Sequence, residues 1–167
     1  MDKSLNDVEL SQLTQQLANY LRSNNLSLVT AESCTGGWIA KCCTDLVGSS
    51  GWFEGGMVSY SNAAKQSMLS VPEVLIRDFG AVSAEVAEAM AAGALGNSNA
   101  RVSLAVTGIA GPGGGCVDKP VGTVWFGWAS YVEGKIKTHS AMECFSGNRD
   151  AVRRQTVEKA MNGILRF

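Results

Sequence analysis

The 167-residue sequence contains a single histidine, His139, and no pair of cysteines in a C-x-x-C arrangement. Zinc sites in proteins are built mainly from several histidine and cysteine ligands, so a site of that kind is excluded. His139 lies in the segment KTHSAM, and we interpret it as an ordinary strand residue. We therefore expect a protein that works without a metal or any other cofactor.

The cysteines also lack the pattern of a disulfide framework, because they are five in number, at 34, 42, 43, 116 and 144, and two are adjacent. A set of this kind is typical of a reducing compartment. The sequence has no apolar run long enough to cross a membrane, and its N-terminus, MDKSLNDVEL, lacks the basic-then-apolar order of a signal peptide. These absences predict a cytoplasmic protein that does not enter a membrane.

An excess of charge of either sign is missing as well, since the net charge is -1 and charged residues make up 17% of the chain. We therefore expect neither nucleic acid nor an anionic membrane surface as a partner. The glycine-rich stretch GIAGPGGGCVDK fits neither G-x-G-x-x-G nor a P-loop ending in G-K-[ST]. It is either a mobile surface turn or a backbone surface that can approach a ligand closely.

What the sequence does contain is an alternation of helical and strand patterns along a chain of single-domain length. The patterns predict helices over 8–24, 35–47, 63–69, 73–79 and 149–165, a longer helix capped by Ser83, and strands over 26–30, 56–60, 102–107, 123–130 and 135–144. The fold class is α/β. We expect a single three-layer α/β/α domain over residues 1–167, with a mixed, mainly parallel sheet and a late antiparallel hairpin.

The most informative stretch is TAESCTGG, residues 30–37, which follows the apolar run LSLV and precedes an expected helix start. A serine between a strand and a helix has the placement of the nucleophile in α/β hydrolases, although G-x-S-x-G is absent. The N–H groups of Thr35, Gly36 and Gly37 would point back toward the serine and could stabilise an oxyanion or hold a phosphate. The alternative is that Ser33 or Thr35 only caps the helix.

A serine nucleophile needs a base, and a desolvated lysine is the usual replacement for histidine. Most of the seven lysines fall on faces that the pattern marks as solvated. Lys65 differs, because it lies in SYSNAAKQS, just after an expected strand and at a helix start. Tyr60 and Asn62 precede it by five and three residues, so a strand-end tyrosine and a lysine one helical turn along can converge on one point.

Five stretches, in order and with consistent spacing, resemble the CinA C-terminal domain family, and within it the stand-alone bacterial nicotinamide-nucleotide amidohydrolases. They are TAESCTGG (30–37), YSNAAK (60–65), GAVSAEVAEAMAAGA (80–94), TGIAGPGGG with KPVGTV (107–115 and 119–124) and FSGNRDAVRRQT (145–156). The resemblance covers nearly the whole chain. It implies an α/β amidase that hydrolyses the carboxamide of nicotinamide mononucleotide to nicotinate mononucleotide and ammonia.

The resemblance also implies a serine nucleophile with lysine and tyrosine partners, and these roles fall on Ser33, Lys65 and Tyr60. Lys65, kept neutral by partial burial, would take the proton of the serine directly or through Tyr60. The substrate's phosphate needs an anion site, for which the 108–115 loop, Lys119 and Arg149 are candidates. The full set of expected substrate contacts is Cys34, Thr35, Gly36, Gly37, Asn62, Thr107, Gly108, Gly111, Gly113, Gly114, Lys119 and Arg149.

Two other functions stay open from the residues alone. In a thiol amidase Cys34 would be the nucleophile, since a helix N-terminus lowers the pKa of a thiol, although no histidine partner for it is evident. A non-catalytic nucleotide- or partner-binding module is the second, because related domains are fused to larger competence-associated proteins. The aromatic residues Trp52, Phe53, Trp125 and Trp128 either belong to the core or support a homo-oligomer, and the sequence does not separate the two.

Overall fold

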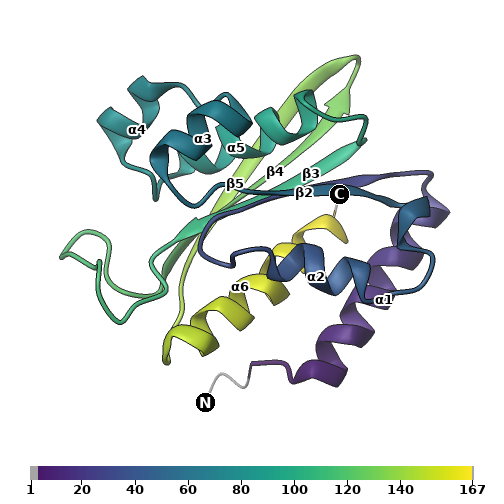
Figure 1. The fold of residues 1–167 in the computed structure, drawn as a ribbon, viewed down its shortest axis with the longest axis horizontal. Coiled ribbons are helices and arrows are strands. Elements are labelled where there is room, and N and C mark those ends of the chain that lie inside the picture. The colour runs from purple at the N-terminus through teal and green to yellow at the C-terminus, as the bar shows by residue number, and fades with distance from the viewer. Residues whose placement is uncertain (1–3, 167) are drawn as a thin grey trace.

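The computed structural model describes residues 4–166, so the first three residues and Phe167 of the expected domain lie outside the described residues. Figure 1 shows three layers, with α3, α4 and α5 on one side of a central sheet and α1, α2 and α6 on the other. The elements are α1 (Asp7–Ser23), β1 (Leu28–Glu32), α2 (Trp38–Thr44), the short helix η1 (Ser49–Gly51), β2 (Phe53–Val58), α3 (Asn62–Leu69), α4 (Glu73–Phe79), α5 (Ala84–Gly96), β3 (Val102–Gly108), β4 (Thr123–Val132), β5 (Lys135–Cys144) and α6 (Arg149–Ile164). The predicted α/β fold class is confirmed.

The order of the strands determines where the loops gather. Within the described residues the sheet has five strands in the order β2-β1-β3-β4-β5. Strand β1 pairs in parallel with both β2 and β3, whereas the β3–β4 and β4–β5 pairs are antiparallel, so β4 alone runs against the others. The chain moves from β1 to the neighbour on one side and returns to the neighbour on the other. At such a reversal, α/β sheets bind ligands outside the carboxyl ends of their strands.

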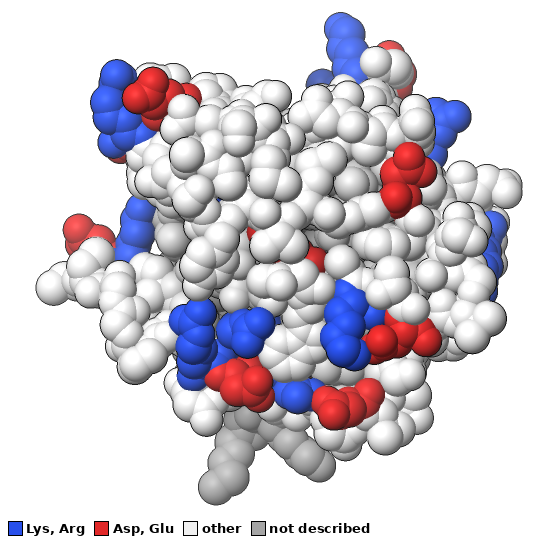
Figure 2. Space-filling view, viewed as in Figure 1, with Lys and Arg blue, Asp and Glu red and all other residues white. Residues whose placement is uncertain are grey.

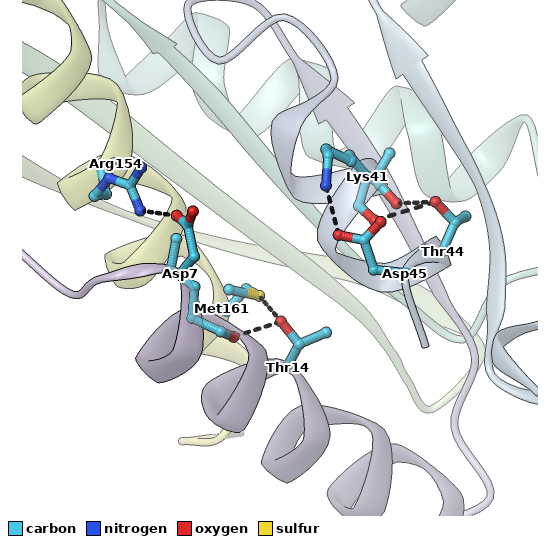
Figure 3. Close-up of polar contacts among 9 residues, drawn as sticks. Asp7, Thr14, Lys41, Thr44, Asp45, Arg154 and Met161 are labelled. Atoms are coloured by element: carbon cyan, nitrogen blue, oxygen red, sulfur yellow. Dashed lines mark hydrogen bonds and ion pairs between the residues drawn. The ribbon is translucent and has the colours of Figure 1, made fainter. Parts of the chain in front are cut away.

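Apolar side chains are packed against both faces of the sheet. The leucine stripe of α1 is buried as its spacing predicts: Leu10, Leu13, Leu17 and Leu21. These leucines join one cluster with buried residues of α2 and α6, and a second cluster lies between α5 and the opposite face of the sheet. Figure 3 shows Met161 of the first cluster, whose sulfur lies 3.7 Å from the Thr14 hydroxyl of α1.

Helix α5 packs very closely against the sheet. Its predicted cap is confirmed, because the Ser83 hydroxyl accepts the N–H of Val86 at the first turn. Ser103 of β3 donates a hydrogen bond to the Ala91 carbonyl at 2.7 Å. A β-carbon on Gly127 of β4 would collide with a backbone carbonyl of the same helix. Small residues on both surfaces therefore allow the approach that the alanines of this helix predict.

Two predicted boundaries near Ser33 are wrong by a few residues. Strand β1 continues to Glu32, so Ser33 follows it directly. The next helix begins at Trp38 rather than at residue 35, because Gly36 and Gly37 have φ angles of 62° and 96°. These angles lie in the left-handed region, which glycine adopts readily and an α-helix does not contain. Residues 33–37 therefore form a loop, called the 33–37 loop below.

Charged side chains of both signs are mixed on the face shown in Figure 2, and no large area of that face carries a single sign. Two ion pairs drawn in Figure 3 join opposite charges, Lys41 with Asp45 and Arg154 with Asp7. The second pair links α6 to α1. In the part of the chain that the structure describes, no helix combines the length and apolar character needed to span a membrane.

Candidate active site

The ends of several elements meet at the carboxyl edge of the three parallel strands. Ser33 follows β1, Tyr60 lies just after β2, and Thr107 and Gly108 end β3. Together with the beginnings of α3 and α6, these ends surround a cavity of about 240 Å³. The described residues that line it are Ser33, Cys34, Tyr60, Asn62, Lys65, Ala81, Val82, Thr107, Gly108, Ala110 and Arg149. All but the two alanines and the valine are residues that the sequence analysis assigned to the site.

The two side chains at the centre of the expected chemistry, Ser33 and Lys65, are in direct contact. The Lys65 Nζ donates to Ser33 Oγ at 3.0 Å and to the Ser59 carbonyl at 3.1 Å. The β1–β3 pairing positions the serine, whose own N–H donates to the Val106 carbonyl. Ser61 caps α3, which places the lysine in the first turn of that helix, where its side chain is buried.

Burial changes the protonation of Lys65. The side chain is 2% exposed, and none of the ion pairs among the described residues includes it. Desolvation lowers the pKa of Lys65 below its ordinary value of 10.5, with a smaller opposing effect from Cys34. At a given pH more of the lysine is therefore a neutral amine, which is the form that can accept the proton of Ser33.

The Cys34 thiol has an environment opposite to that of an activated nucleophile. It is buried, and burial raises the pKa of the Cys34 thiol to about 12, although a hydrogen bond from its own backbone N–H partly opposes the rise. A reactive cysteine needs a lowered pKa, because the thiolate is the attacking species. The alternative of a thiol amidase, in which a helix N-terminus lowers the pKa of Cys34, therefore lacks its premise, because the thiol is buried and α2 begins four residues later.

Tyr60 lies at the rim of the cavity rather than between the serine and the lysine. Its side chain is 62% exposed, and its hydroxyl accepts a hydrogen bond from Arg149 Nη2 at 3.0 Å. Arg149 Nη1 donates to the Gly111 carbonyl at 2.8 Å. Among the described residues, no hydrogen bond links the tyrosine hydroxyl to Ser33 or Lys65. Tyr60, Arg149 and the Gly111 carbonyl, at the start of the glycine-rich loop, are thus linked by hydrogen bonds.

Part of the expected anion site lies away from this cavity. The Lys119 Nζ donates to the carbonyl of Phe79 at the end of α4, at 2.7 Å. Gly113 and Gly114 are exposed. None of these three expected contacts is among the described residues that line the cavity. In Figure 1 the loop that carries them is the green segment extending to the left of the sheet.

The backbone of the 33–37 loop differs from the expected row of free N–H groups. The Gly36 N–H donates to the Ser33 carbonyl at 3.0 Å and is not free. Thr35, Gly36 and Gly37 line a neighbouring depression of about 520 Å³ together with residues of α6. Within the described chain, the N–H groups of Cys34 and Thr35 have no oxygen acceptor. The N–H of the residue after the nucleophile is the usual oxyanion donor in α/β hydrolases.

Sequence reasoning missed the apolar part of the lining, which is Ala81, Val82 and Ala110. The turn before α5 is held at the site by Thr107, whose hydroxyl donates to the Ala81 carbonyl at 2.8 Å. The Ser83 cap was the available signal, because it indicates that this turn lies where α5 begins. Nothing in the small apolar residues themselves predicts contact with a ligand.

Comparison with known proteins identifies the family of the chain. The family model of the CinA C-terminal domain matches residues 10–167. The chain belongs to this family. The nicotinamide-nucleotide amidohydrolase PncC of Escherichia coli strain K12 is 50% identical over 160 residues, which cover 96% of this chain and 95% of the relative. The protein of the same name from Pseudomonas putida is 51% identical over 158 residues, which cover 95% of this chain and 96% of the relative.

The family also shares the architecture. A crystal structure of the competence/damage inducible protein CihA from Agrobacterium tumefaciens superposes with a TM-score of 0.88 at 38% identity, covering 99% of this chain and 98% of that one. The resemblance that the five sequence stretches carry is therefore confirmed for the family and for the fold.

Proposed function

We propose that this member of the CinA C-terminal domain family hydrolyses the carboxamide of nicotinamide mononucleotide, giving nicotinate mononucleotide and ammonia. The observation that carries the proposal is the 3.0 Å contact between Ser33 Oγ and the buried Lys65 Nζ at a cavity on the carboxyl edge of the sheet. Relatives about half identical to the chain, and matched along almost their whole length, have the name nicotinamide-nucleotide amidohydrolase. A serine beside a neutral amine is suited to acyl transfer from an amide.

In the first half-reaction Ser33 Oγ attacks the carboxamide carbon while the neutral amine of Lys65 takes the hydroxyl proton. The tetrahedral intermediate then collapses, the carbon–nitrogen bond breaks, and the lysine returns this proton to the leaving ammonia. An ester between the serine and the nicotinate group is left. In the second half-reaction water attacks this ester, the lysine takes the water proton and passes it to the serine oxygen, and nicotinate mononucleotide is released.

The N–H groups of Cys34 and Thr35 are the donors that we assign to the oxyanion. They lie beside the nucleophile and have no oxygen acceptor within the described chain. Donors aimed at the developing negative charge in a water-poor site are worth about 2.7–4 kcal/mol each in related chemistry. Gly36 and Gly37 shape the loop rather than bind the oxyanion.

Arg149 is the group that we assign to the substrate's phosphate. Its guanidinium lies at the cavity rim, where Tyr60 and the Gly111 carbonyl hold it in place. A planar guanidinium matches the oxygens of a phosphate, so it can bind with two hydrogen bonds. Tyr60 then positions this arginine and does not relay a proton. Lys119, Gly113 and Gly114 would contribute only if their loop moved toward the cavity.

Two other functions have less support. The raised pKa of the Cys34 thiol argues against a thiol amidase. A module that only binds a nucleotide would have no use for a buried lysine hydrogen-bonded to a serine, since such a lysine costs stability.

The test is the release of ammonia from nicotinamide mononucleotide by the purified protein, with the nucleotide product identified by chromatography. Equal amounts of ammonia and nicotinate mononucleotide are expected. Nicotinamide riboside, which lacks the phosphate, should have a kcat/KM lower by on the order of a hundredfold or more, because each charge-assisted hydrogen bond is worth about 1.5–3 kcal/mol. No ammonia from either compound would overturn the proposed function.

Arg149→Ala tests the phosphate assignment separately. This variant should lose most of the preference for the mononucleotide while using the riboside nearly as well as the parent does. Lys119→Ala is the matched control, because its ammonium binds a backbone carbonyl away from the cavity, and it should leave the preference unchanged. Equal losses on both substrates in Arg149→Ala would assign the arginine to the fold instead.

A further inference from the structure

A buried carboxylate lies directly before the proposed nucleophile. Glu32 is the last residue of β1, is 0% exposed, and is absent from the ion pairs among the described residues. Its Oε1 accepts hydrogen bonds from the Thr35 hydroxyl at 2.7 Å and the Ile39 N–H at 2.8 Å, and its Oε2 accepts one from the Ala40 N–H at 2.9 Å. Burying a carboxylate without a cation costs free energy, so a function of the buried Glu32 side chain would explain why it is present.

The three bonds fasten the 33–37 loop from the inside. Glu32 lies immediately before the loop, while Ile39 and Ala40 lie just after it in the first turn of α2. One side chain therefore holds the two ends of the loop together, and its bond to Thr35 fixes the middle. A serine, threonine or asparagine at residue 37 would suffice if the only need were to cap a short helix. That position is instead Gly37, which has no side chain to form a cap and whose φ of 96° other residues rarely adopt.

A guanidinium fastens the same loop from the other side. Arg153 of α6 donates from Nε to the Cys34 carbonyl at 3.1 Å and from Nη2 to the Thr35 carbonyl at 2.9 Å. Its charged group also lies over the ring of Trp38, 5.3 Å from the ring centre, which restricts the side chain further. The loop is thus held by hydrogen bonds to the buried Glu32 carboxylate and to the Arg153 guanidinium.

Peptide geometry converts these contacts into directions for the two proposed oxyanion donors. A trans peptide group is planar, and its C=O and N–H point in opposite directions. The Ser33 carbonyl, which accepts the Gly36 N–H, belongs to the same peptide group as the Cys34 N–H. The Cys34 carbonyl, which accepts from Arg153, belongs to the same group as the Thr35 N–H. The direction of each of these two N–H groups is therefore set by a hydrogen bond to the carbonyl at the opposite edge of the same peptide group.

From these contacts we infer that Glu32 and Arg153 are positioning residues for catalysis, which hold the 33–37 loop so that the Cys34 and Thr35 N–H groups face the oxyanion. The inference rests on the proposed function, because it assumes attack by Ser33 on a carbonyl. Neither side chain touches the substrate in this role. Both act through the backbone, so their contribution appears in the transition state and not in substrate binding.

Two variants weaken the loop contacts with little change in size. Glu32→Gln replaces one acceptor oxygen by a donor, so the side chain loses its bond to Ala40 or its bonds to Thr35 and Ile39. Arg153→Lys keeps the charge but cannot donate to two carbonyls from a fixed fork. Each variant should lower kcat for nicotinamide mononucleotide by roughly 10- to 100-fold and leave KM within about threefold, as expected for misplaced oxyanion donors.

Arg154→Lys is the matched control. Arg154 is the next residue along α6 and also lies over Trp38, 4.9 Å from its ring centre, but it pairs with Asp7 and not with the loop (Figure 3). Its kcat should equal that of the parent within about twofold. Thermal melting establishes that each variant is folded. If Glu32→Gln fails to fold, Arg153→Lys decides alone.

The pH profile separates positioning from an effect on the base. In both loop variants the midpoint of the kcat profile should match that of the parent, because Lys65 keeps its surroundings. A shifted midpoint would mean that the groups act on the lysine, and would overturn the inference. So would a folded Arg153→Lys variant whose kcat stays within twofold of the parent.

A parent protein that releases no ammonia from the mononucleotide would instead contradict the proposed function. The loop is then tested by the rate at which a fluorophosphonate labels Ser33, because its phosphoryl oxygen also develops negative charge beside the loop. Labelling slowed roughly 10- to 100-fold in the two variants supports the inference. Equal labelling in parent and variants, or no labelling of the parent, overturns it.

Discussion

Lys65 is the side chain on which the proposed mechanism depends most. Its Nζ is enclosed, and within the described residues its hydrogen-bond partners are two neutral oxygens, the Ser33 hydroxyl and the Ser59 carbonyl. The same burial that penalises the charged form also supplies a neutral amine next to a hydroxyl. A surface lysine at this distance from a serine would be protonated and could not act as a base.

The first prediction concerns the pH dependence of turnover. Because only the neutral amine accepts a proton, kcat should rise with pH through the lowered pKa of Lys65 and then level off. Lys65→Arg should lose roughly a thousandfold or more in kcat, because arginine stays protonated. Ammonia release measured from pH 5 to 10 at constant ionic strength tests both statements. A flat profile in the parent, or an arginine variant with a tenth of its activity, would contradict the role of the lysine.

The pairing of Ser33 with Lys65 was implied by the family resemblance, and the position of both residues after expected strand ends was compatible with it, since such ends share one edge of a sheet. Sequence reasoning did not predict the hydrogen bond of Tyr60 to Arg149, because α6 lies 89 positions further along the chain. Lys119 was predicted to lie at the anion site because it follows the glycine-rich loop in the sequence. The path of a long loop depends on tertiary contacts such as its bond to Phe79, which no local pattern records.

Among the helices and strands, the type of each element was easier to predict than the residues at which it begins and ends. The apolar residues Trp38, Ile39, Cys42 and Cys43 have helical spacing, which predicts a helix here but does not determine its first residue. Periodicity reports which face is buried, whereas the φ angles of Gly36 and Gly37 decide where the helix begins. The difference matters here because residues 35–37 belong to the loop that also contains Ser33, the proposed nucleophile.

The second prediction tests the close packing of α5 on the sheet. Gly127→Ala should lower the free energy of unfolding by about 1–3 kcal/mol or more, because the added methyl group collides with the Ala87 carbonyl. Gly55→Ala is the matched control within β2, since an added β-carbon there meets no atom within 4 Å. It should change stability by no more than about 0.5 kcal/mol. Urea unfolding of both variants makes the comparison, and equal stabilities would contradict the packing described here.

At the scale of the whole molecule, the sheet order accounts for the location of the site. Segments far apart in the sequence, from Ser33 to Arg149, line one cavity. They meet there because β1 lies between β2 and β3 in the sheet. The early alternation of strands and helices predicted the α/β class, and two consecutive strand patterns predicted the late hairpin. These patterns did not specify that β1 lies between β2 and β3, because strand order depends on packing across the whole sheet.

The third prediction links the buried lysine to the stability of the whole protein. In the unfolded chain a lysine has a pKa of about 10.4. The folded-state pKa of Lys65 is lower. Between these two values the unfolded state binds a proton that the folded state does not, so the contribution of Lys65 to the free energy of unfolding rises with pH. Relative to a Lys65→Met variant, the parent should therefore gain stability as the pH is raised toward 10.

Thermal unfolding of the parent and of Lys65→Met from pH 7 to 10 measures this difference. Lys137→Met, which changes an exposed lysine of β5, is the control and should follow the parent at every pH. A difference between the parent and Lys65→Met that stays constant over this range would show that the lysine is not destabilised by its charge.

In the proposed reaction the Ser33 hydroxyl, and not the Cys34 thiol, attacks the substrate. The most direct measurement compares ammonia release from nicotinamide mononucleotide by folded Ser33→Ala and Cys34→Ala variants. Ser33→Ala should lose nearly all turnover, since it deletes the attacking oxygen, whereas Cys34→Ala should keep kcat within about tenfold of the parent. Turnover within a few-fold of the parent in Ser33→Ala, together with an inactive Cys34→Ala, would contradict the account.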